Sequence, residues 1–394
     1  MKGRTINERA MNVAGVMSGT SADGVDVALV RIYPRNRLPR LRLLAYEVFP
    51  YPSKLRQSVL AAVEAKSISV AELARLQTRL GLMYAESIET TCRKHGQKIE
   101  LIGCHGQTFY HQAQLELYLG RKLATTWQAQ DVGPIVERLH VPVVSDFRPA
   151  DIAAGGQGAP LVPLLDYECF RHTKRARILQ NLGGIGNLTL VPPNAKPDGL
   201  LAFDTGPGNM IMDRLMDTLY GRAMDRNGAM ARRGRVIEAV VDAALREPYF
   251  QRQPPKAAGR EDFGRDYTAA FLRNCRRHSS KPEDAVATAT ALTARSLALA
   301  VEQFVLPRLK SRSADFVVSG GGAVNSTLME MIDRLLTPMG LDVMTTDALG
   351  MPWAAKEAAA FALLAWNTWH RLPGNLPAAT GAKRAVVLGR VSYA

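Results

Sequence analysis

Apolar residues in the first part of the chain follow two patterns, uninterrupted runs and helical spacing. Uninterrupted short runs are typical of buried strands, and apolar positions that repeat every three or four residues are typical of helices. In chain order, the patterns predict strands at 13–16, 25–32 and 41–49, helices at 55–65 and 70–92, and a strand at 99–104. Three strands followed by helices and a further strand predict a mixed α/β domain.

The same succession starts again in the second half of the chain. The patterns predict strands at 178–182, 188–191, 200–203 and 316–319, helices at 210–220, 235–245, 285–306, 328–336 and 357–369, and a last strand at 385–388. The composition changes after a short strand at 141–144, so we predict domains at 1–145 and 146–394, with the tail able to pack back on the first. The two halves resemble duplicated units in topology, although no residue-level repeat accompanies the resemblance.

Two glycine-rich segments have the composition of phosphate loops. Gly19 to Asp26 lies between two predicted strands, and Asp204 to Asn209 follows the strand predicted at 200–203. Glycine allows backbone N–H groups to turn toward an anion, and Ser and Thr hydroxyls add donors. Two such loops, one in each predicted domain, predict that both domains bind one polyphosphate.

Length and composition narrow the class of protein. The 394 residues suit two domains, and 47% hydrophobic with 22% charged residues is typical of a soluble globular protein. No segment offers the roughly 18 uncharged apolar residues of a membrane span, and the first residues lack the apolar stretch of a signal peptide. We therefore expect a cytoplasmic protein that does not bind membranes.

Charge and cysteine content exclude further classes. The net charge is +14, but the basic residues are dispersed and no aromatic side chains lie among them for base stacking. This pattern favours solvated faces over nucleic-acid binding. Cys92, Cys104, Cys169 and Cys275 form no CxxC pair, which predicts reduced packing residues rather than a disulfide framework or a zinc site.

The motifs of the chain occur in the order of a known enzyme family. They are Met17 to Ser21 with Asp23, Gly24 and Asp26; Gly103 to Thr108; Asp146 to Arg148 with Asp151; Gly155 to Pro160; Asn181 to Ile185; Asp204 to Asn209; Gly259 to Glu261; Gly320 to Gly322 with Asn325; Glu357-Ala358; and Gly374 to Pro377. On these motifs the chain resembles the anhydro-N-acetylmuramic acid kinases, which belong to the superfamily of sugar kinases, heat-shock chaperones and actin. The resemblance implies an α/β, two-domain actin-like ATPase (ribonuclease H-like) fold with an interdomain active-site cleft, and a homodimer.

The resemblance also implies a reaction. An ATP-dependent kinase of this family hydrolytically opens the ring of 1,6-anhydro-N-acetylmuramic acid and phosphorylates O6, giving N-acetylmuramic acid 6-phosphate and ADP in peptidoglycan recycling. Because O6 is part of the anhydro bridge, water must attack C1 while the bridge opens. This chemistry needs a carboxylate base, donors around the phosphates, and Mg²⁺.

Asp204 is the predicted general base, and its alternative role is to cap the turn that follows it. Asp23 or Asp26 would orient Mg²⁺ through its water shell, although Asp23-Gly24 also suits a plain hairpin turn. Gly320 to Gly322 is the expected adenosine site, or else a tight strand-to-helix turn. The residues expected to bind ATP and its phosphates are Gly19, Thr20, Ser21, Ala22, Asp23, Gly24, Val25, Asp26, Gly183, Gly184, Gly206, Gly208, Asn209, Gly320, Gly321, Gly322 and Asn325.

The residues expected to bind the sugar are His105, Gln107, Thr108, Arg148, Asp151 and Glu357. Arg148 is the candidate for the lactyl carboxylate, which a guanidinium can bind in bidentate fashion, with Asp151 holding its position or contacting sugar hydroxyls; a structural salt bridge between the two is the alternative. A satisfied structural histidine is the alternative for His105. Glu357 begins an apolar helix, where an acid also favours the helix N-terminus.

Three segments depart from the family pattern. Residues 128–131 lack a glycine, Ala257-Ala258 stands where Ser-Thr is more usual, and Ala354 stands where an acid is common. None of these touches the phosphate loops, so they bear on substrate detail. Two other functions stay open: a conventional amino-sugar kinase acting on a free hydroxyl, and a non-catalytic ATP-gated sensor, which would be expected to lack the Asp204 base.

Overall fold

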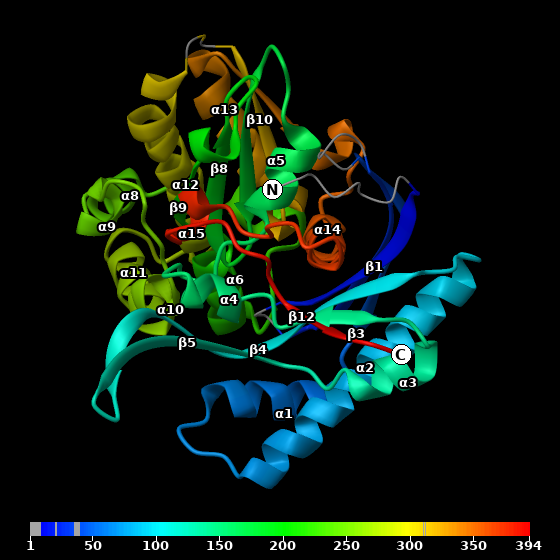
Figure 1. Ribbon diagram of the computed structural model, residues 1–394. Coiled ribbons are helices and arrows are strands. Elements are labelled where there is room, and N and C mark those ends of the chain that lie inside the picture. The colour runs from blue at the N-terminus through cyan, green and yellow to red at the C-terminus, as the bar shows by residue number, and fades with distance from the viewer. Residues whose placement is uncertain (1–8, 20–21, 35–39, 310, 312) are drawn as a thin grey trace. The chain divides into compact units, whose positions relative to one another are not determined.

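The computed structural model describes residues 9–19, 22–34, 40–309, 311 and 313–394 (Figure 1). The described residues up to Cys169 form one compact unit together with Ala355–Ala394, which we call unit 1, and Phe170–Ala354 form unit 2. This division differs from the boundary expected at residue 145. Unit 1 extends past that residue because Arg148 bonds to His105 and Asp151 bonds to Asn375, all within unit 1.

Unit 1 is built on a seven-stranded sheet in the order β12-β6-β4-β1-β2-β3, with β5 paired to β4. Its strands are β1 (Met11–Ser18), β2 (Gly24–Tyr33), β3 (Arg40–Pro50), β4 (Leu101–Tyr118), β5 (Arg121–Ala129), β6 (Val143–Ser145) and β12 (Arg390–Ser392). β1, β2 and β3 pair antiparallel, whereas β4 runs parallel to both β1 and β6. The tail of the chain joins this sheet because β12 pairs with β6.

The helices of unit 1 are α1 (Ser53–Glu64), α2 (Val70–Lys94), α3 (Gly133–Leu139), α4 (Pro149–Ala153), α5 (Pro163–Phe170), α14 (Lys356–Trp369) and α15 (Pro377–Thr380). α2 begins where the Ser69 hydroxyl accepts a hydrogen bond from the Glu72 N–H at 3.1 Å, a typical N-cap. Its predicted apolar face, including Leu76, Leu80 and Met83, is buried in the core of this unit.

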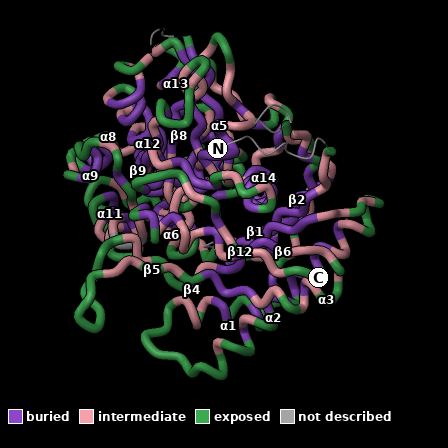
Figure 2. The backbone as a smooth tube through the Cα atoms, in the orientation of Figure 1, coloured by how far each residue is buried: buried purple, intermediate pink, exposed green. Residues whose placement is uncertain are grey.

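Helix α14 is buried along most of its length (Figure 2). A Cβ on Gly15 of β1 would lie only 1.8 Å from the Ala358 carbonyl oxygen, so glycine is what lets this helix lie directly against the sheet. Trp366 is 1% exposed and belongs to the core.

Unit 2 is built on a five-stranded sheet in the order β11-β10-β7-β8-β9. Its strands are β7 (Ala176–Leu182), β8 (Ile185–Val191), β9 (Leu201–Pro207), β10 (Ala314–Ser319) and β11 (Leu341–Thr345). Its helices are α6 (Met210–Tyr220), α7 (Ala229–Arg233), α8 (Glu238–Leu245), α9 (Pro248–Gln251), α10 (Arg260–Phe263), α11 (Arg265–His278), α12 (Pro282–Ala300) and α13 (Ser326–Leu336).

The two sheets share one topology. In unit 2, β7, β8 and β9 pair antiparallel, and β10 runs parallel to both β7 and β11. Unit 1 repeats this arrangement with β1, β2, β3, β4 and β6 in the corresponding places. This is the strand order of ribonuclease H-like folds, to which the actin-like ATPases belong. The predicted α/β class and the predicted duplication of topology are both confirmed.

Two parts of unit 1 differ from the pattern predictions. The strand expected at 385–388 is irregular, and the strand that forms is β12, a few residues later. β5 and the second half of β4 were not predicted. Beyond Phe109 these two strands form a ribbon that is mostly exposed, so no buried face imposes an alternation on its sequence (Figure 2).

One helix among the described residues is long and apolar enough to span a membrane, the segment Pro282–Arg308 that contains α12. However, 72% of its apolar window is buried inside the structure. The buried side chains of α12 belong to the core of unit 2 and include Val286, Leu292 and Leu297. Packing within unit 2 therefore accounts for the apolar character of this helix.

Candidate active site

The first glycine-rich segment forms the turn between β1 and β2. These strands pair as far as Met17 and Asp26, and the Ala22 N–H donates to the Gly19 carbonyl at 3.1 Å to close the turn. The Gln107 side chain, from β4, donates from Nε2 to the same carbonyl at 3.1 Å. Gln107 was expected on the sugar; in the structure its side-chain amide bonds to this turn, and its contact with the sugar stays a prediction. Thr20 and Ser21 lie outside the described residues.

The two aspartates of this turn have different surroundings. Asp23 is exposed and pairs with Arg56 at 3.1 Å, whereas Asp26 is partly buried and accepts a hydrogen bond of 2.5 Å from the Tyr46 hydroxyl. Burial raises the pKa of Asp26, the Tyr46 hydrogen bond opposes that rise, and the charge of Asp23 adds to it. A divalent cation bound through water beside these carboxylates would relieve their repulsion, so the pair is chemically suited to Mg²⁺.

Glu357, at the start of α14, is electrostatically linked to two of these groups. Burial is the main cause of the raised pKa of Tyr46, the contact with Asp26 comes second, and the charge of Glu357 adds to both. The same charge also acts to raise the pKa of Arg148. Burial nevertheless lowers the pKa of Arg148 to about 10 overall, so the guanidinium remains charged at neutral pH. Glu357 thus lies within electrostatic range of both Tyr46, the partner of Asp26, and Arg148.

Arg148 is held by His105 and by a loop carbonyl. Its Nε and one terminal nitrogen donate to Nε2 of His105 at 3.0 and 2.8 Å, and its other terminal nitrogen donates to the Gly158 carbonyl at 2.8 Å. Because Nε2 accepts, His105 is the neutral tautomer that donates from Nδ1 to the Gly106 carbonyl at 2.8 Å. Burial, followed by the Arg148 cation, lowers the pKa of His105 well below its usual value. His105 therefore orients Arg148.

Asp151 is fully buried, and its carboxylate accepts hydrogen bonds from other residues of unit 1. Its carboxylate accepts from Nδ2 of Asn375 at 2.6 Å, from the Thr380 hydroxyl at 2.7 Å and from the Gly158 N–H at 2.8 Å. These bonds tie the loop that carries the Gly158 carbonyl to the tail of the chain. Asp151 therefore supports Arg148 through this loop, and the alternative of a direct salt bridge between the two is not what the structure shows. Thr108, expected on the sugar, lies on β4, where its hydroxyl accepts from Gln128 at 3.5 Å.

In unit 2, Asp204 lies on β9 and is held by a neighbouring segment. Its Oδ2 accepts from the Ala258 N–H at 2.8 Å, its backbone N–H donates to the Lys256 carbonyl at 2.9 Å, and its carbonyl accepts from the Tyr249 hydroxyl at 2.9 Å. The carboxylate does not cap the turn after β9. Since the Ala258 donor is main chain, alanine at this position supplies it as well as serine or threonine would.

Burial raises the pKa of Asp204 to about 6, partly opposed by the Ala258 hydrogen bond. Asp262 raises this pKa slightly further, and the Lys256 cation lowers it. A carboxyl that titrates near 6 is deprotonated at neutral pH yet basic enough to take a proton. That is the property required of a general base.

Lys256 has an unusual environment beside Asp204. Its Nζ lies 4.9 Å from the ring centre of Tyr249, 5.0 Å from that of Phe304 and 5.9 Å from that of Phe203. It also donates to the carbonyls of Phe250 and Tyr249 at 3.3 and 3.4 Å. Burial lowers the pKa of Lys256 to about 8, which the Arg252 cation lowers further and the Asp204 carboxylate opposes.

Three turns of unit 2 converge beyond the ends of its strands. The Gly208 N–H donates to the Gly184 carbonyl at 2.9 Å, and the Asn209 N–H donates to the Gly183 carbonyl at 2.8 Å. A Cβ on Gly322 would lie 2.6 Å from Cβ of Leu182, which places the turn after β10 against the same strand end. The structure therefore brings together glycines predicted from three separate motifs, which are Gly183, Gly184, Gly208, Gly320, Gly321 and Gly322. Gly206 lies within β9, where a Cβ would be 2.8 Å from the Phe250 ring.

Local packing explains why glycine or asparagine is needed at some of these positions but not at others. Gly320 has a φ of +82°, and a Cβ there would lie 2.8 Å from the Leu182 carbonyl oxygen, so local structure requires glycine. Asn325 accepts from the Leu328 N–H at 3.0 Å and caps α13. At Gly183 and Gly184, in contrast, a Cβ would meet nothing closer than 3.6 Å. Their lack of a side chain leaves backbone accessible at the turn, which suits close approach of a phosphate.

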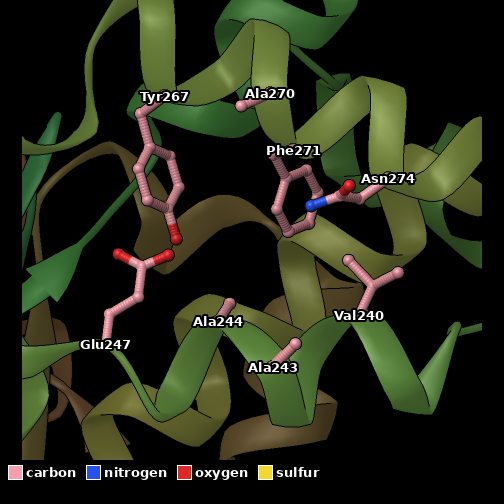
Figure 3. Close-up of a pocket in the computed structure, with 8 residues that line it drawn as sticks. All are labelled: Val240, Ala243, Ala244, Glu247, Tyr267, Ala270, Phe271 and Asn274. Atoms are coloured by element: carbon pink, nitrogen blue, oxygen red, sulfur yellow. The ribbon is translucent and has the colours of Figure 1, made fainter.

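A small cavity in unit 2 lies apart from these turns, between α8 and α11. Its lining includes Glu247, Tyr267 and Phe271, and Figure 3 shows the Glu247 carboxylate facing the Tyr267 hydroxyl. Burial raises the pKa of both groups. None of the residues predicted for catalysis or binding lines it.

Comparison with known proteins decides the family. The sequence matches the family described as "Anhydro-N-acetylmuramic acid kinase" over residues 11–394. The chain belongs to the anhydro-N-acetylmuramic acid kinase family. A relative with that name from Bacillus cereus (strain AH187) is 38% identical over 386 residues, covering 97% of this chain and 99% of its own. One from Bacillus thuringiensis subsp. konkukian is 37% identical with the same coverage. As a member, the protein is a kinase.

Solved structures align loosely along most of the chain. The activator of the 2-hydroxyisocaproyl-CoA dehydratase from Clostridium difficile aligns with a TM-score of 0.43 and 12% identity, covering 91% of this chain and 95% of its own. A ROK family glucokinase from Streptomyces griseus aligns with a TM-score of 0.38 and 12% identity, covering 90% and 99%.

Sequence patterns missed three side chains beside the predicted residues. Tyr46 bonds to Asp26, Tyr51 bonds to the phosphate loop, and Lys256 lies beside Asp204. Lys256 immediately precedes Ala257-Ala258, which departs from the family pattern, so the sequence already marked this part of the chain as unusual. Tyr46 and Tyr51 lie in an apolar strand and at its end, where nothing in the sequence distinguishes them from core residues.

Proposed function

We propose that this member of the anhydro-N-acetylmuramic acid kinase family converts 1,6-anhydro-N-acetylmuramic acid, ATP and water to N-acetylmuramic acid 6-phosphate and ADP, in peptidoglycan recycling. The observation that carries this proposal is the Asp204 carboxyl, fixed on β9 by Ala258 and with a pKa raised to about 6. In an anhydro-sugar kinase this carboxyl would activate water, whereas in a conventional kinase it would take the proton of the acceptor hydroxyl, so the sugar assay below is what separates the two.

In the proposed reaction Asp204 accepts a proton from the attacking water. The water oxygen bonds to C1 as the bond from C1 to O6 breaks, and the released O6 bonds to the γ-phosphorus as its bond to the ADP oxygen breaks. General base catalysis of this kind contributes about 10²- to 10⁴-fold to the rate. The charge of Lys256 favours the deprotonated form of Asp204, and the Ala258 N–H fixes the direction of the carboxylate.

The phosphates of ATP would be bound by backbone N–H groups of the turn between β1 and β2 and of the glycine turns of unit 2. Asp26, with Asp23 beside it, would hold Mg²⁺ through water, and that ion would neutralise charge on the transferred phosphate. Gly320 to Gly322 would leave room for the adenosine.

Arg148 would bind the lactyl carboxylate of the sugar. Its guanidinium is held by His105 and by the Gly158 carbonyl, so its position is fixed before substrate arrives. Glu357, within electrostatic range of Arg148, would contact sugar hydroxyls. We further propose that the protein is cytoplasmic and forms a homodimer.

The test is ADP release by purified protein with ATP and Mg²⁺. The sugars are 1,6-anhydro-N-acetylmuramic acid, N-acetylmuramic acid and N-acetylglucosamine, each with the native protein and with Asp204→Asn. We expect turnover with the anhydro sugar alone, reduced at least about 100-fold in the variant. In ¹⁸O-labelled water the label should appear on C1 of the product. Turnover confined to a free-hydroxyl sugar would instead establish a conventional kinase, and nucleotide binding without turnover would indicate the sensor.

A further inference from the structure

We propose that Tyr51 is a positioning residue for nucleotide binding, which fixes the two ends of the β1–β2 turn by bonding to both Ser18 and Asp23. The proposal rests on the proposed function in one respect, namely that this loop binds the phosphates of ATP. Tyr51 lies outside every glycine-rich motif of the chain.

Tyr51 follows the last residue of β3, and it reaches the loop in two ways. Its backbone N–H donates to the Asp23 carbonyl at 2.9 Å, at the end of the loop that leads into β2. Its hydroxyl donates to the Ser18 hydroxyl at 2.9 Å, at the end of the loop that leaves β1. One residue from a neighbouring strand therefore fixes the distance between the two ends.

A second anchor lies beside the first. The Gln107 side-chain carbonyl lies 3.4 Å from the Tyr51 hydroxyl, and its amide donates to the Gly19 carbonyl at 3.1 Å. Ser18 and Gln107 are each 1% exposed and Tyr51 is 5% exposed, so these bonds form away from competing water. Burial also raises the pKa of Tyr51, so its hydroxyl keeps its proton at any physiological pH.

This arrangement has a specific consequence for binding. A phosphate loop binds well when its N–H groups already point at the anion, because a loop that must be ordered on binding loses affinity. The Tyr51 and Ser18 side chains are both buried, so loss of their bond would release one end of the loop without removing a group exposed to the nucleotide. The effect should therefore fall on nucleotide affinity and leave affinity for the sugar unchanged.

The experiment compares Tyr51→Phe with Thr91→Val. Both remove one buried hydroxyl from unit 1, but the Thr91 hydroxyl donates only to the Ser87 carbonyl of its own helix at 2.8 Å. The readouts are the Kd of a fluorescent ATP analogue with Mg²⁺, the KM for the anhydro sugar, and stability in urea. We expect Tyr51→Phe to raise the nucleotide Kd about 5- to 10-fold, corresponding to one hydrogen bond, with the sugar KM within about twofold. Thr91→Val should leave the Kd unchanged.

Ser18→Ala removes the other partner of the same bond and serves as the second variant if Tyr51→Phe does not fold. In a double-mutant cycle, the effects of Tyr51→Phe and Ser18→Ala on the nucleotide Kd should be strongly non-additive. The proposal is wrong if Tyr51→Phe changes the Kd no more than Thr91→Val does, or if the two effects add. A native protein that does not bind the nucleotide analogue would overturn the proposed function as well, so the two failures are distinguishable.

Discussion

The chemical character of Asp204 comes from its surroundings rather than from its residue type. An aspartate carboxyl ordinarily has a pKa of 3.8, and burial on β9 raises the pKa of Asp204 to about 6. Lys256, held among three aromatic rings and two carbonyls, works in the opposite direction by stabilising the carboxylate. The pKa of Asp204 is thus set mainly by burial, which the Ala258 hydrogen bond and, to a smaller extent, the Lys256 charge oppose.

The rate of the proposed reaction should depend on pH through this group. Because the base must be deprotonated, kcat/KM should rise with pH through about 6 in the native protein. In Lys256→Met the carboxylate loses a stabilising charge, so its pKa rises and the acid limb of the profile moves to higher pH. A pH-rate profile of both proteins measures the shift.

Lys256→Arg is the matched control because it keeps the charge, and its acid limb should stay in place. Asp262 and Arg252, the other charges near this pair, are unchanged in both variants. If kcat falls in Lys256→Met but the acid limb does not move, Lys256 contributes by packing against its neighbours and not through its charge.

At the scale of elements, the site depends on strand ends and on one close helix contact. The turns after β1, β7, β9 and β10 carry most of the glycines, whereas Asp26 lies at the start of β2, Asp204 on β9 and Glu357 at the start of α14. Helix α14 brings Glu357 into range of Tyr46 and Arg148 only because its backbone reaches β1 at Gly15.

We therefore expect Gly15→Ala to be strongly destabilising. The new methyl group would overlap the Ala358 carbonyl oxygen, 1.8 Å from its position, and the helix would have to move away from the sheet. Overpacking of this kind lowers the free energy of unfolding by about 2–4 kcal/mol. Urea unfolding measures it. Gly199→Ala is the control, since a Cβ there has no neighbour within 4 Å; equal stability of the two variants would contradict the contact.

At the scale of the whole molecule, each unit repeats the same five-strand topology and adds different chemistry to it. Unit 1 carries the glycine-rich turn with its two acids and Arg148, and unit 2 carries Asp204, the proposed base, and three glycine turns. The buried Asp204 carboxyl also affects stability. A carboxyl with a native pKa above its unfolded pKa stabilises the fold at low pH and loses that contribution as pH rises through about 6.

Asp204→Asn should consequently make the protein more stable at pH 8. Asparagine keeps an acceptor for the Ala258 N–H but has no charge to bury. The gain should be about 1–3 kcal/mol at pH 8, smaller near pH 5, and absent below about pH 4, where the native aspartate is protonated in both states. Denaturant unfolding at three pH values tests this. Asp198→Asn, on an exposed turn, is the control and should show no such trend.

The sequence by itself determined the α/β class, most strands and helices, the repeated topology and the family. These features are encoded locally, by apolar runs, helical spacing and glycine-rich motifs, so each can be recognised without its neighbours. It did not determine the end of unit 1 or the β4–β5 ribbon, whose exposed residues follow no burial pattern.

Only the tertiary structure decided what each motif residue contacts. It showed that Asp151 bonds to Asn375 in a buried network rather than to Arg148, and that His105 orients Arg148. It also showed that the Gln107 amide bonds to the turn between β1 and β2. It also revealed Tyr51 and Lys256, whose partners lie far away in sequence or in a segment without regular structure. The physical reason is that hydrogen bonds, burial and pKa depend on groups brought together from distant parts of the chain, and a local pattern carries no record of them.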